Sequence, residues 1–366
     1  MRRLTVLMSL AAAVAALAVS RRPQHATDDV RLRFAASADD GFARALAPRP
    51  FVLPEDHGPH FDYQTEWWYF NGHLTDEDGG RYALHDVVFQ VVQLASRRTL
   101  YVRQIGLAEA SSGRHVSGER LLTREEPLTS EPGSFAIGIG DGAMSGQDGQ
   151  TYRLIASAEG WTYDLTLTNA APSLIHDDDG LVDLGEAGVT YYYSRPRLDV
   201  TGTLDTGAGP RRVTGLAWLD KQWGNFQPII VYWDWASIQL DDGMDMMVTN
   251  LRGQRQQPID RYATLRRPGG DVVRIGGDGF AFEPLSDTWT SERTGTTYNT
   301  RWRVTVPGEG IDVTLEPMVA ASEFASGLLG VVYWEAGVDV VDAAGVRVGQ
   351  GFVELNWART FGPSAN

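Results

Sequence analysis

The stretch Thr65-Glu-Trp-Trp-Tyr-Phe-Asn-Gly-His-Leu74 decides the fold, because it runs through Asp78-Gly79 into a second apolar segment from Tyr82 to Val92. Aromatic residues at this density favour a β-strand, since their side chains pack well on a pleated surface. An aspartate-glycine pair between two such segments is a strong signal for the tight turn of a β-hairpin. The stretch therefore predicts an antiparallel hairpin near the start of the folded chain.

The same layout of aromatic strand, glycine turn and second strand occurs twice more. One copy is Trp233-Asp-Trp235 before Asp242-Gly243, and the other is Tyr333-Trp-Glu335 before Ala344-Gly345. The recurrence indicates two β domains that each begin with a tryptophan-rich strand. The proline- and glycine-containing stretch from Arg195 to Pro210 is the candidate junction between them.

The rest of the chain also predicts strands. Forty glycines interrupt short apolar runs, and no stretch after the N-terminal leader keeps a helical apolar period. One helical turn is expected at residues 41–47. Many short strands at this spacing are typical of sandwiches and barrels, so the predicted fold class is all-β. The predicted strands include Trp67–Leu74, Tyr82–Val92, Thr151–Ala158, Thr162–Leu167, Val213–Leu219, Trp233–Leu240, Met246–Leu251, Trp302–Val306, Ile311–Leu315, Val331–Val340 and Gly351–Asn356.

The first 26 residues predict a cleavable signal peptide and lead-in. Arg2-Arg3 precede an apolar run from Leu4 to Val19, and Ala16-Leu-Ala18 offers a small-x-small cleavage motif. This run is shorter than the ~20 apolar residues of a comfortable membrane-spanning helix. We therefore expect an exported protein, periplasmic or extracellular, with an uncleaved N-terminal anchor as the alternative. The chain has no cysteine, which excludes disulfides and thiolate chemistry.

The chain carries a formal net charge of −15. An acidic surface repels nucleic acid, and the sequence has no basic cluster that would neutralise a run of phosphates. The acidic runs Asp76-Glu-Asp78 and Asp177-Asp-Asp179 lack the ligand spacing of a calcium loop and are interpreted as solvated turns. The composition therefore argues against a nucleic-acid partner, and it leaves open a peripheral approach to a membrane for the delivery of a ligand. It leaves the oligomeric state open.

Lys221 is the only lysine among 32 lysine and arginine residues, and it lies within Gly215-Leu-Ala-Trp-Leu-Asp-Lys-Gln-Trp-Gly-Asn-Phe226. The pKa of a lysine ammonium changes readily on burial, so beside Asp220 and Trp223 it is a candidate acid, base or ligand anchor. The alternative is that Lys221 forms a structural salt bridge with a neighbouring carboxylate.

Four long segments carry a family resemblance: His57-Gly-Pro-His60, the stretch Thr65–Leu74, Trp218-Leu-Asp-Lys-Gln-Trp-Gly-Asn-Phe226 and Trp233-Asp-Trp-Ala-Ser-Ile-Gln-Leu-Asp-Asp-Gly243. In this order they resemble the AttH-like family, which is related to the acyclic-carotenoid hydratases and is similar in fold to fungal Diels–Alderases. The resemblance continues through Trp289, Thr294-Gly295, Tyr333-Trp-Glu335 and Gly351-Phe-Val-Glu-Leu355, and covers roughly residues 55 to 357. It implies two lipocalin-like antiparallel β-barrels packed around an apolar pocket, which we place at residues 50–205 and 211–358. It implies no metal or other cofactor.

The related hydratases are thought to protonate a double bond with a histidine-x-tryptophan element and a tyrosine-x-aspartate element. The matching positions in this chain hold Lys221-Gln-Trp223 and Val248-Thr-Asn250. An amide does not protonate carbon, and an ammonium with a pKa of about 10.4 is a poor acid. Loss of this acid set argues against carotenoid hydration. Asp220 remains a candidate acid if burial raises its pKa.

Four histidines, His57, His60, His73 and His85, fall within 29 residues. His57 and His60 with a third ligand would form a zinc site, but the pair precedes the first strand and we expect no metal. Relatives usually carry a glutamine and an arginine where this chain has His85 and Gln90. His85 is a candidate proton carrier near neutral pH, with a hydrogen-bonded strand histidine as the alternative.

Glu66, Glu335 and Glu354 stand on aromatic-rich strands, where a buried carboxylate must be paired or protonated. We expect Glu354 to bind backbone amides or arginines, and we leave both a structural and an acidic role open for Glu66. Aromatic side chains dominate the walls of apolar pockets. The predicted catalytic residues are Asp220, Lys221, Glu66 and His85, and the predicted substrate-binding residues are Trp67, Tyr69, Trp223, Trp235, Asn250, Tyr333 and Glu335.

Two functions are compatible with these features. The first is an exported lipocalin-like protein that binds a hydrophobic lipid, isoprenoid, polyene or polyketide-like molecule in an aromatic-lined pocket. The second is a cofactor-independent hydratase, isomerase or cyclase that uses the region of Asp220, Lys221 and Trp223. The sequence leaves enzymatic activity open. It has no serine-hydrolase elbow, phosphate loop or dinucleotide motif, and it places no carboxyl pair for sugar hydrolysis.

Overall fold

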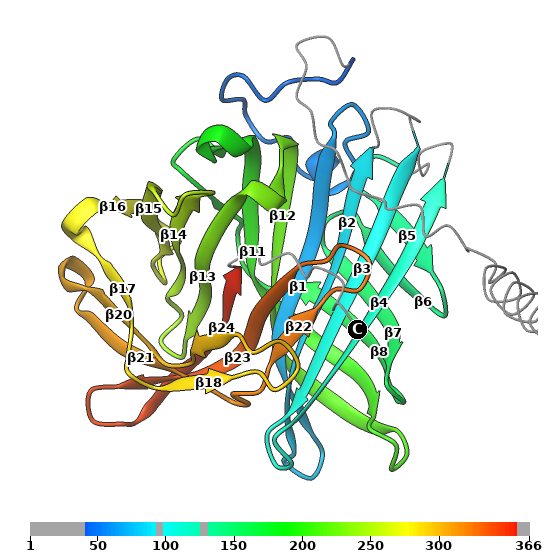
Figure 1. The fold of residues 1–366 in the computed structure, drawn as a ribbon, viewed down its shortest axis with the longest axis vertical. Helices are drawn as coiled ribbons and strands as arrows, with labels where there is room; N and C mark the ends of the chain where they lie inside the picture. Colours follow the sequence, from blue (N-terminus) through cyan, green and yellow to red (C-terminus); the bar gives the residue numbers. More distant parts are fainter. Residues whose placement is uncertain (1–40, 93–97, 125–130, 357–366) are drawn as a thin grey trace, which may run out of the picture. The chain divides into compact units, whose positions relative to one another are not determined.

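The computed structural model describes residues 41–92, 98–124 and 131–356, and it confirms the all-β prediction. Antiparallel strands make up most of this part of the chain (Figure 1). No helix among the described residues is long and apolar enough to cross a membrane. The predicted signal segment lies outside the described residues, so it stays a prediction.

The first sheet follows the order β4-β3-β2-β1-β12-β11-β8-β7-β6-β5, with β9 and β10 paired to β11. It curls so that its end strand β4 approaches β5 and β7, and we call it the first barrel. Its strands are β1 (Thr65–Asp76), β2 (Arg81–Val92), β3 (Thr99–Glu109), β4 (Arg114–Arg124), β5 (Phe135–Ile139), β6 (Gly142–Gln147), β7 (Thr151–Ala158), β8 (Trp161–Asn169), β9 (Leu174–Ile175), β10 (Leu181–Asp183), β11 (Gly188–Asp205) and β12 (Arg211–Phe226).

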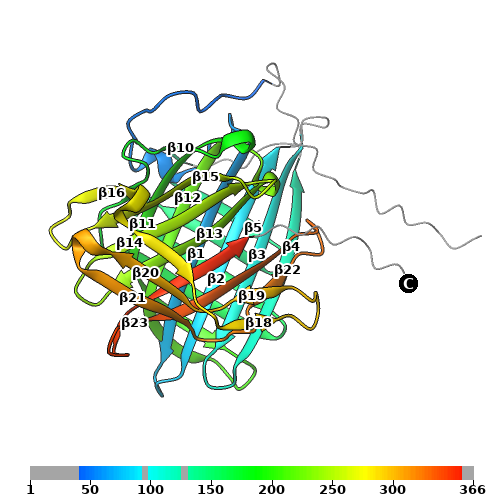
Figure 2. The same cartoon turned by 60° about the vertical axis from the view of Figure 1, so that its left-hand side comes forward.

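The second sheet follows the order β16-β15-β14-β13-β24-β23-β21-β20-β17, with β22 paired to β23, and we call it the second barrel (Figure 2). Strands β18 (Thr288–Thr290) and β19 (Thr297–Asn299) form a separate small sheet. The strands of the second barrel are β13 (Val231–Leu240), β14 (Asp245–Gly253), β15 (Pro258–Arg266), β16 (Val272–Gly276), β17 (Ala281–Pro284), β20 (Trp302–Val306), β21 (Ile311–Pro317), β22 (Glu323–Ala325), β23 (Val332–Asp342) and β24 (Arg347–Asn356).

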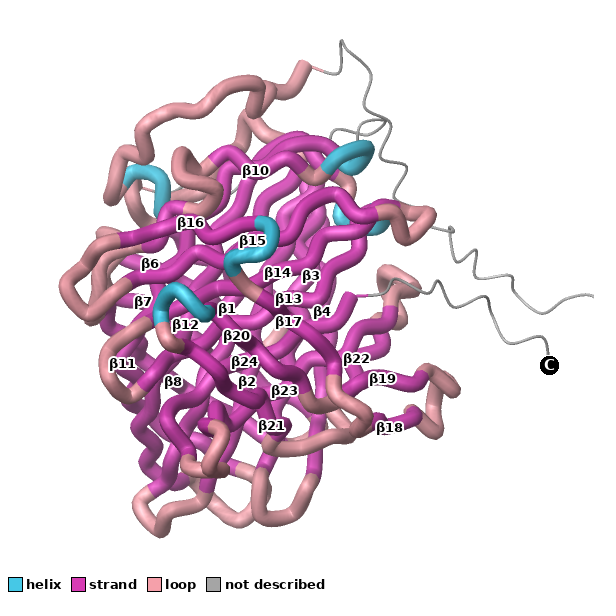
Figure 3. Tube along the Cα trace, turned by 90° about the vertical axis from the view of Figure 1, so that its left-hand side faces the viewer, coloured by secondary structure: helices cyan, strands magenta, loops and turns pink. Residues whose placement is uncertain are grey.

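Helical structure in the described ranges is limited to 3₁₀ turns (Figure 3). The prediction of a helical turn at residues 41–47 is wrong, because this segment is irregular and its Ala43 N–H bonds the carbonyl of Asp62 instead. The turns are Glu55–His57, Gly185–Ala187, Pro228–Ile230, Gly277–Gly279 and Pro307–Glu309.

All three predicted hairpins are present as β1–β2, β13–β14 and β23–β24. Each turns at a glycine with positive φ: Gly79 at 86°, Gly243 at 91° and Gly345 at 78°. This left-handed backbone region strains most residues but is open to glycine. The turn chemistry that the sequence displays therefore sets the three hairpins on which both barrels are built.

The sheets divide the chain between Phe226 and Val231. The stretch proposed as the domain junction, Arg195–Pro210, instead includes the end of β11 and its connection to β12, and both strands belong to the first barrel. Strand β12 pairs with β1 on one side and β11 on the other. The long β11–β12 pair thus keeps residues 211–226 within the first sheet.

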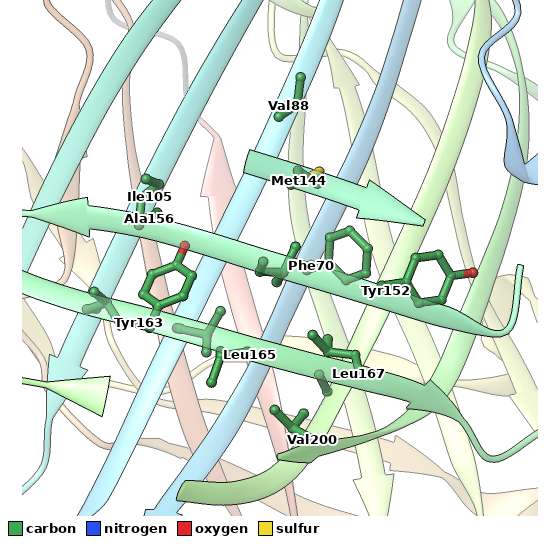
Figure 4. Packing of buried hydrophobic residues seen from close by; sticks show 14 of the residues in the cluster. Phe70, Val88, Ile105, Met144, Tyr152, Ala156, Tyr163, Leu165, Leu167 and Val200 are labelled. Carbon is green, nitrogen blue, oxygen red and sulfur yellow. The ribbon is translucent and has the colours of Figure 1, made fainter. Parts of the chain in front are cut away.

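Each barrel contains its own apolar core. In the first barrel, Phe70 and Val88 meet Tyr152, Leu165 and other side chains from β7 and β8 (Figure 4). The second barrel is filled by residues such as Trp302, Trp334 and Phe282. A third cluster joins the barrels and includes Trp67, Tyr69, Trp218, Trp235 and Phe352. Where one stretch of a strand contributes to two clusters, both of its faces are buried, as in residues 67–74 of β1.

The backbones of the two barrels come close at Gly337 of β23. A methyl group added at this glycine would lie 2.4 Å from Cβ of Ala83 on β2 and 3.0 Å from Nε2 of His73 on β1. Side chains that close must shift, and well-packed interiors have little free space for this movement. Glycine at this position therefore permits the contact between barrels.

We expect Gly337→Ala to lower the free energy of unfolding by about 1–3 kcal/mol, because the added methyl overpacks the interface. Gly138→Ala is the matched control, because a methyl group there meets no atom within 4 Å. The double variant Ala83→Gly/Gly337→Ala should recover part of the loss. Urea unfolding measures all three variants, and equal losses at Gly337 and Gly138 would contradict the predicted contact.

Candidate functional site

Strand register brings several ionisable side chains together between the barrels. Tyr69 of β1 lies opposite Asp220 of β12. In the second barrel, Glu335 of β23 lies opposite Glu354 of β24. These two cross-strand pairs face each other, since the Tyr69 hydroxyl donates a hydrogen bond to Glu335. We call the resulting group the inter-barrel site; it consists of Tyr69, His85, Asp220, Glu335 and Glu354.

The contacts within the site centre on Glu335. Its Oε1 accepts the bond from Tyr69, and its Oε2 lies 3.1 Å from Nδ1 of His85 on β2. The indole N–H of Trp233 donates a hydrogen bond to Glu354, the cross-strand neighbour of Glu335. We expected Glu354 to bind backbone amides or arginines. In the structure it instead accepts a hydrogen bond from Trp233 and forms a carboxyl pair with Glu335.

Asp220 is held by three donors. The hydroxyl of Tyr192 and the indole N–H of Trp218 donate to its carboxylate at 2.5 and 2.6 Å, and Ser194 donates the third bond. Behind it, Nε2 of His176 lies 2.7 Å from the Ser194 hydroxyl. These bonds fix the orientation of the Asp220 carboxyl group at the interface.

Burial raises the pKa of all three carboxyls. The pKa of Glu335 rises well above its ordinary value because the group is buried and lies beside Glu354. Burial also raises the pKa of Glu354 to about 8, although the hydrogen bond from Trp233 lowers it. For Asp220, burial raises the pKa to about 6, although its three hydrogen bonds favour the charged form. At neutral pH the Glu335–Glu354 pair therefore holds protons, which it titrates as a unit.

Solvent contact differs among the three carboxyls. Glu335 is 2 % exposed and Asp220 is 4 % exposed, whereas Glu354 keeps partial contact with solvent. Glu354 is thus the member of the pair that exchanges protons with water most directly.

His85 is a neutral side chain with one unused polar atom. Burial lowers its pKa well below the ordinary range, so its contact with Glu335 joins two neutral groups. Its ring fits against Gly106 of β3, where an added Cβ would lie 2.3 Å from the ring. Within the described structure, Nε2 of His85, Nδ1 of His73 and Nδ2 of Asn71 have no hydrogen-bond partner. These three atoms lie on the face of β1 and β2 that meets the second barrel.

Aromatic rings surround the acid groups. Trp67 meets Phe226 edge-on with ring centroids 4.9 Å apart, and Tyr69 meets Trp235 edge-on at 5.7 Å. On the other side, Tyr333 stacks on Phe324 at 5.1 Å. The predicted substrate-binding residues Trp67, Tyr69, Trp235, Tyr333 and Glu335 are therefore brought together, along with the predicted catalytic residues Asp220 and His85.

Lys221 and Glu66 lie outside the inter-barrel site. Lys221 follows Asp220 on β12, so it points to the opposite face, into the first barrel. Its ammonium donates to Glu66 and lies 3.7 Å from the ring centroid of Trp68, and both charged side chains are fully buried. Burial lowers the pKa of Lys221 to about 8, although the nearby Glu66 opposes this shift. Burial also raises the pKa of Glu66, but Lys221 and His60 outweigh it and keep the value below the ordinary one.

The segment before β1 completes this buried pair. His60 lies 2.7 Å from Glu66 through Nδ1 and 3.1 Å from Asp56 through Nε2, and Arg49 donates to Asp56 at 2.7 Å. The His60 ring stacks on Trp223 with centroids 3.9 Å apart. Trp223 thus belongs to the closure of the first barrel rather than to the inter-barrel site.

The two histidines of the zinc alternative have side-chain partners at both ring nitrogens. Besides the His60 contacts, Nδ1 of His57 lies 2.5 Å from the Tyr193 hydroxyl and Nε2 lies 2.6 Å from Arg195. Burial lowers the pKa of His57 to about 3. These contacts are those of a histidine that fastens the N-terminal segment to β11.

Asn250 points into the second barrel. It lines a cavity of about 430 Å³ at the mouth of that barrel, together with Asp234, Arg252 and Trp302. Its amide donates to the carbonyl of Phe282 at 3.1 Å, and Arg252 forms a two-bond pair with Asp234 at 2.6 and 2.8 Å. Lys221 and Asn250, which occupy the positions matched to the hydratase motif, therefore point into different barrels.

Sequence reasoning missed the residues whose role depends on register. Glu354 joins the site because it lies opposite Glu335, and Tyr192, Ser194 and His176 support Asp220 from β11 and the adjoining turn. The alternation of β23 and β24 was visible in the sequence, and aligning the two strands about the Ala344-Gly345 turn would have paired the glutamates.

The AttH-like family model matches residues 44–357. The chain belongs to the AttH-like family. A crystal structure at 2.00 Å of a Nitrosomonas europaea protein, provisionally described as AttH, is 27 % identical to this AttH-like chain. The alignment covers 87 % of this chain and 100 % of the other, with a TM-score of 0.78. No curated protein matches the chain.

Two further solved structures share the fold at low identity. Kievitone hydratase from Nectria haematococca is 15 % identical, with 87 % of this chain and 96 % of that chain covered and a TM-score of 0.67. CghA is also 15 % identical, with coverage of 87 % and 97 % and a TM-score of 0.55. The AttH-like fold is therefore present in proteins with different names and little sequence similarity.

We expect Lys221→Met to lower the free energy of unfolding by about 3–5 kcal/mol, because it leaves Glu66 buried without its cation. The double variant Lys221→Met/Glu66→Met should lose less than the sum of the single variants, since it removes both charges. Arg212→Met is the control, because this arginine pairs with Glu77 on the exposed surface. Denaturant unfolding with an unchanged midpoint for Lys221→Met would contradict the structural role.

The raised pKa of Glu354 predicts a pH-dependent stability. Between its ordinary value of 4.5 and about 8, the folded chain holds a proton that the unfolded chain has released. The free energy of unfolding should therefore fall as pH rises through this window. Glu354→Gln stays neutral throughout, so its loss of stability across the window should be smaller. Urea unfolding at several pH values, with the exposed Glu292→Gln as control, checks this, and parallel curves for wild type and Glu354→Gln would refute it.

Proposed function

We propose that this protein is a proton-transfer enzyme that hydrates, isomerises or cyclises a hydrophobic alkene at the inter-barrel site. The single observation that carries the proposal is the buried Glu335–Glu354 pair, which lies between aromatic rings and holds protons at neutral pH. A carboxylic acid with a raised pKa is available as a general acid under conditions where an ordinary glutamate is ionised.

In the hydration reaction, a neutral carboxyl of the pair transfers its proton to one alkene carbon. A C–H bond forms, the π bond breaks, and a carbocation and a carboxylate remain. Water then forms a C–O bond to the cation and gives a proton to a carboxylate, so one molecule of water is added and the acid is restored. Isomerisation uses the same first step and ends with loss of a different proton. Because Glu354 keeps partial contact with solvent, it supplies the route for proton exchange.

The surroundings suit a charged intermediate. Aromatic faces stabilise cations, and Trp67 and Trp235 belong to the apolar cluster between the barrels. The ionisable Asp220 adds a negative charge on the side of the first barrel. Nε2 of His85 has no partner in the described structure and is therefore positioned to hydrogen bond a polar group of the substrate.

Asp220 keeps the functional role predicted for it, whereas we assign Lys221 and Glu66 a structural role. Their fully buried ion pair lies in the first barrel and is completed by His60. The hydratases are thought to carry acids at the positions of Lys221 and Asn250. In this proposal the Glu335–Glu354 pair supplies the proton instead. The name of kievitone hydratase supports hydration as a reaction that this fold accommodates.

Binding of a hydrophobic molecule without turnover is the second candidate, and the aromatic wall favours it. Lipid, isoprenoid, polyene and polyketide-like molecules suit either function. A crystal structure of CghA with Sch210972 supports binding as a function that this fold accommodates. We also propose export to the periplasm or beyond, on the basis of the predicted leader, and a small-molecule rather than nucleic-acid partner.

We expect Glu335→Gln to lower kcat/KM by about 10²–10⁴-fold, the usual contribution of a general acid. Turnover is detected by incubating the protein with acyclic isoprenoid alkenes in ¹⁸O-labelled water and measuring label in the product by mass spectrometry. Isomers and cyclic products are separated by chromatography. The exposed Glu292→Gln is the control and should behave as wild type.

The same experiment separates enzyme from carrier. Isoprenoids that bind to wild type and Glu335→Gln with similar affinity, but are recovered unchanged from both, would support a binding protein and reject the proposed chemistry. Molecules that copurify with the mature protein, identified by mass spectrometry, supply the substrate candidates.

A further inference from the structure

Glu119 of β4 receives hydrogen bonds from both barrels. From the first barrel, Gln104 of β3 donates its amide to Oε1 of Glu119 at 2.8 Å. From the second barrel, the Ser326 hydroxyl donates to Oε1 at 2.5 Å and the backbone N–H of Leu328 donates to Oε2 at 3.0 Å. A carboxylate bonded in this way fixes the position of the second-barrel segment on the edge of the first barrel.

The Glu119 contacts continue to the inter-barrel site through Gln104. Oε1 of Gln104 accepts a hydrogen bond from the Tyr333 hydroxyl at 2.8 Å. The Tyr333 ring stacks on Phe324, and the His85 ring centroid lies 5.9 Å from that of Phe324. Glu119 is therefore two hydrogen bonds away from an aromatic side chain that packs beside the acid pair.

The residues 319–331, here called the cover segment, follow β21 and lead into β23; they include β22, which pairs with β23 over three residues. The carbonyl of Ser322 accepts the backbone N–H of Glu335 at 3.0 Å, and the carbonyl of Ala320 accepts the Trp334 indole at 2.7 Å. Further along, the tip of the segment at Gly327 and Leu328 is exposed. The cover segment is thus held to β23 by the short pairing of β22, and its tip is held to Glu119.

Access to the site requires movement of some part of this packing. Glu335 and His85 are almost completely buried, so a substrate reaches them only when covering residues move aside. The bonds to Glu119 lie near the surface, where Glu119 is partly exposed and water competes for its carboxylate. The strand pairing of β23 with β24, by contrast, spans the length of both strands.

We propose that Glu119 is a positioning residue of the inter-barrel site: it fixes the cover segment and Tyr333 over the Glu335–His85 end, and its release admits the substrate. The meaning of this step for catalysis rests on the proposed function, whereas the closure itself is a property of the fold. Opening exposes Phe324 and Tyr333, so the entering molecule meets aromatic rings first, as a hydrophobic substrate requires.

Hydrogen–deuterium exchange of the full chain tests the closure. We expect Glu119→Gln to raise the exchange rate of backbone amides in the cover segment by about tenfold, because charge-assisted bonds are weakened. Ser326→Ala, which removes one of the bonds and leaves the strands intact, should raise it by a smaller factor. Glu109→Gln is the matched control, because this glutamate lies on β3 and bonds Ser112. Unchanged exchange in both test variants would overturn the proposal.

A second readout distinguishes positioning from general support of the fold. Infrared absorption of protonated carboxyl groups, assigned by subtraction of Glu335→Gln, reports the protonation of the acid pair. Release of the cover segment admits water, so the midpoint of this signal should move to lower pH in Glu119→Gln and stay in place in Glu109→Gln. An unchanged midpoint together with unchanged KM and kcat would show a merely structural contact and reject the positioning role.

These experiments can reject the proposed enzyme and the proposed closure independently of each other. Faster exchange in Glu119→Gln with no turnover by the wild type would support the closure and reject the enzyme. Turnover that depends on Glu335 but is insensitive to Glu119→Gln, with no change in exchange, would support the enzyme and reject the closure.

Discussion

Strands β1 and β23 and residues 217–224 of β12 are buried on both faces almost throughout, and this constraint governs the chemistry of the molecule. Successive side chains of a strand point to opposite faces, so one set fills the strand's own barrel while the other meets the second barrel. Asp220 and Lys221 are adjacent in sequence but lie in separate environments, one between the barrels and one inside the first. Each charged group must therefore be satisfied by side chains of its own face, because neither face opens broadly to water.

The two faces satisfy this requirement in opposite ways. Inside the first barrel, Lys221 and Glu66 carry opposite charges, and the pair stays ionised because each group lowers the cost of burying the other. Between the barrels, Glu335 and Glu354 carry the same potential charge, and both retain protons because ionisation of either is opposed by burial and by its neighbour. A carboxyl pair of this kind contributes less to stability than apolar residues of the same volume would, which is why its presence points to chemistry.

The elements were more predictable from sequence than the site. Aromatic strands and glycine turns fixed the three hairpins, because these signals are local. Membership of the site depends on which residues of distant strands stand opposite one another: Tyr69 meets Asp220 across 151 positions of sequence, and Glu335 meets Tyr69 from the other barrel. Lys221 is distinctive in composition, yet composition does not tell which face of β12 it occupies. The local sequence around Glu354 predicts a structural carboxylate, and only the register with Glu335 makes it part of an acid pair.

The packed core of the first barrel explains why its interior does not hold the candidate site. A small barrel holds a ligand only if side chains leave its interior open. Here the first barrel is packed with aromatic and aliphatic residues, and His60 of the N-terminal segment closes it by stacking on Trp223 of β12. Because the interface-facing positions alternate with these core positions, side chains between the barrels can be exchanged without repacking either core. An architecture of this kind conserves its fold while its reaction changes, since the residues that fold each barrel are not those that would contact the substrate.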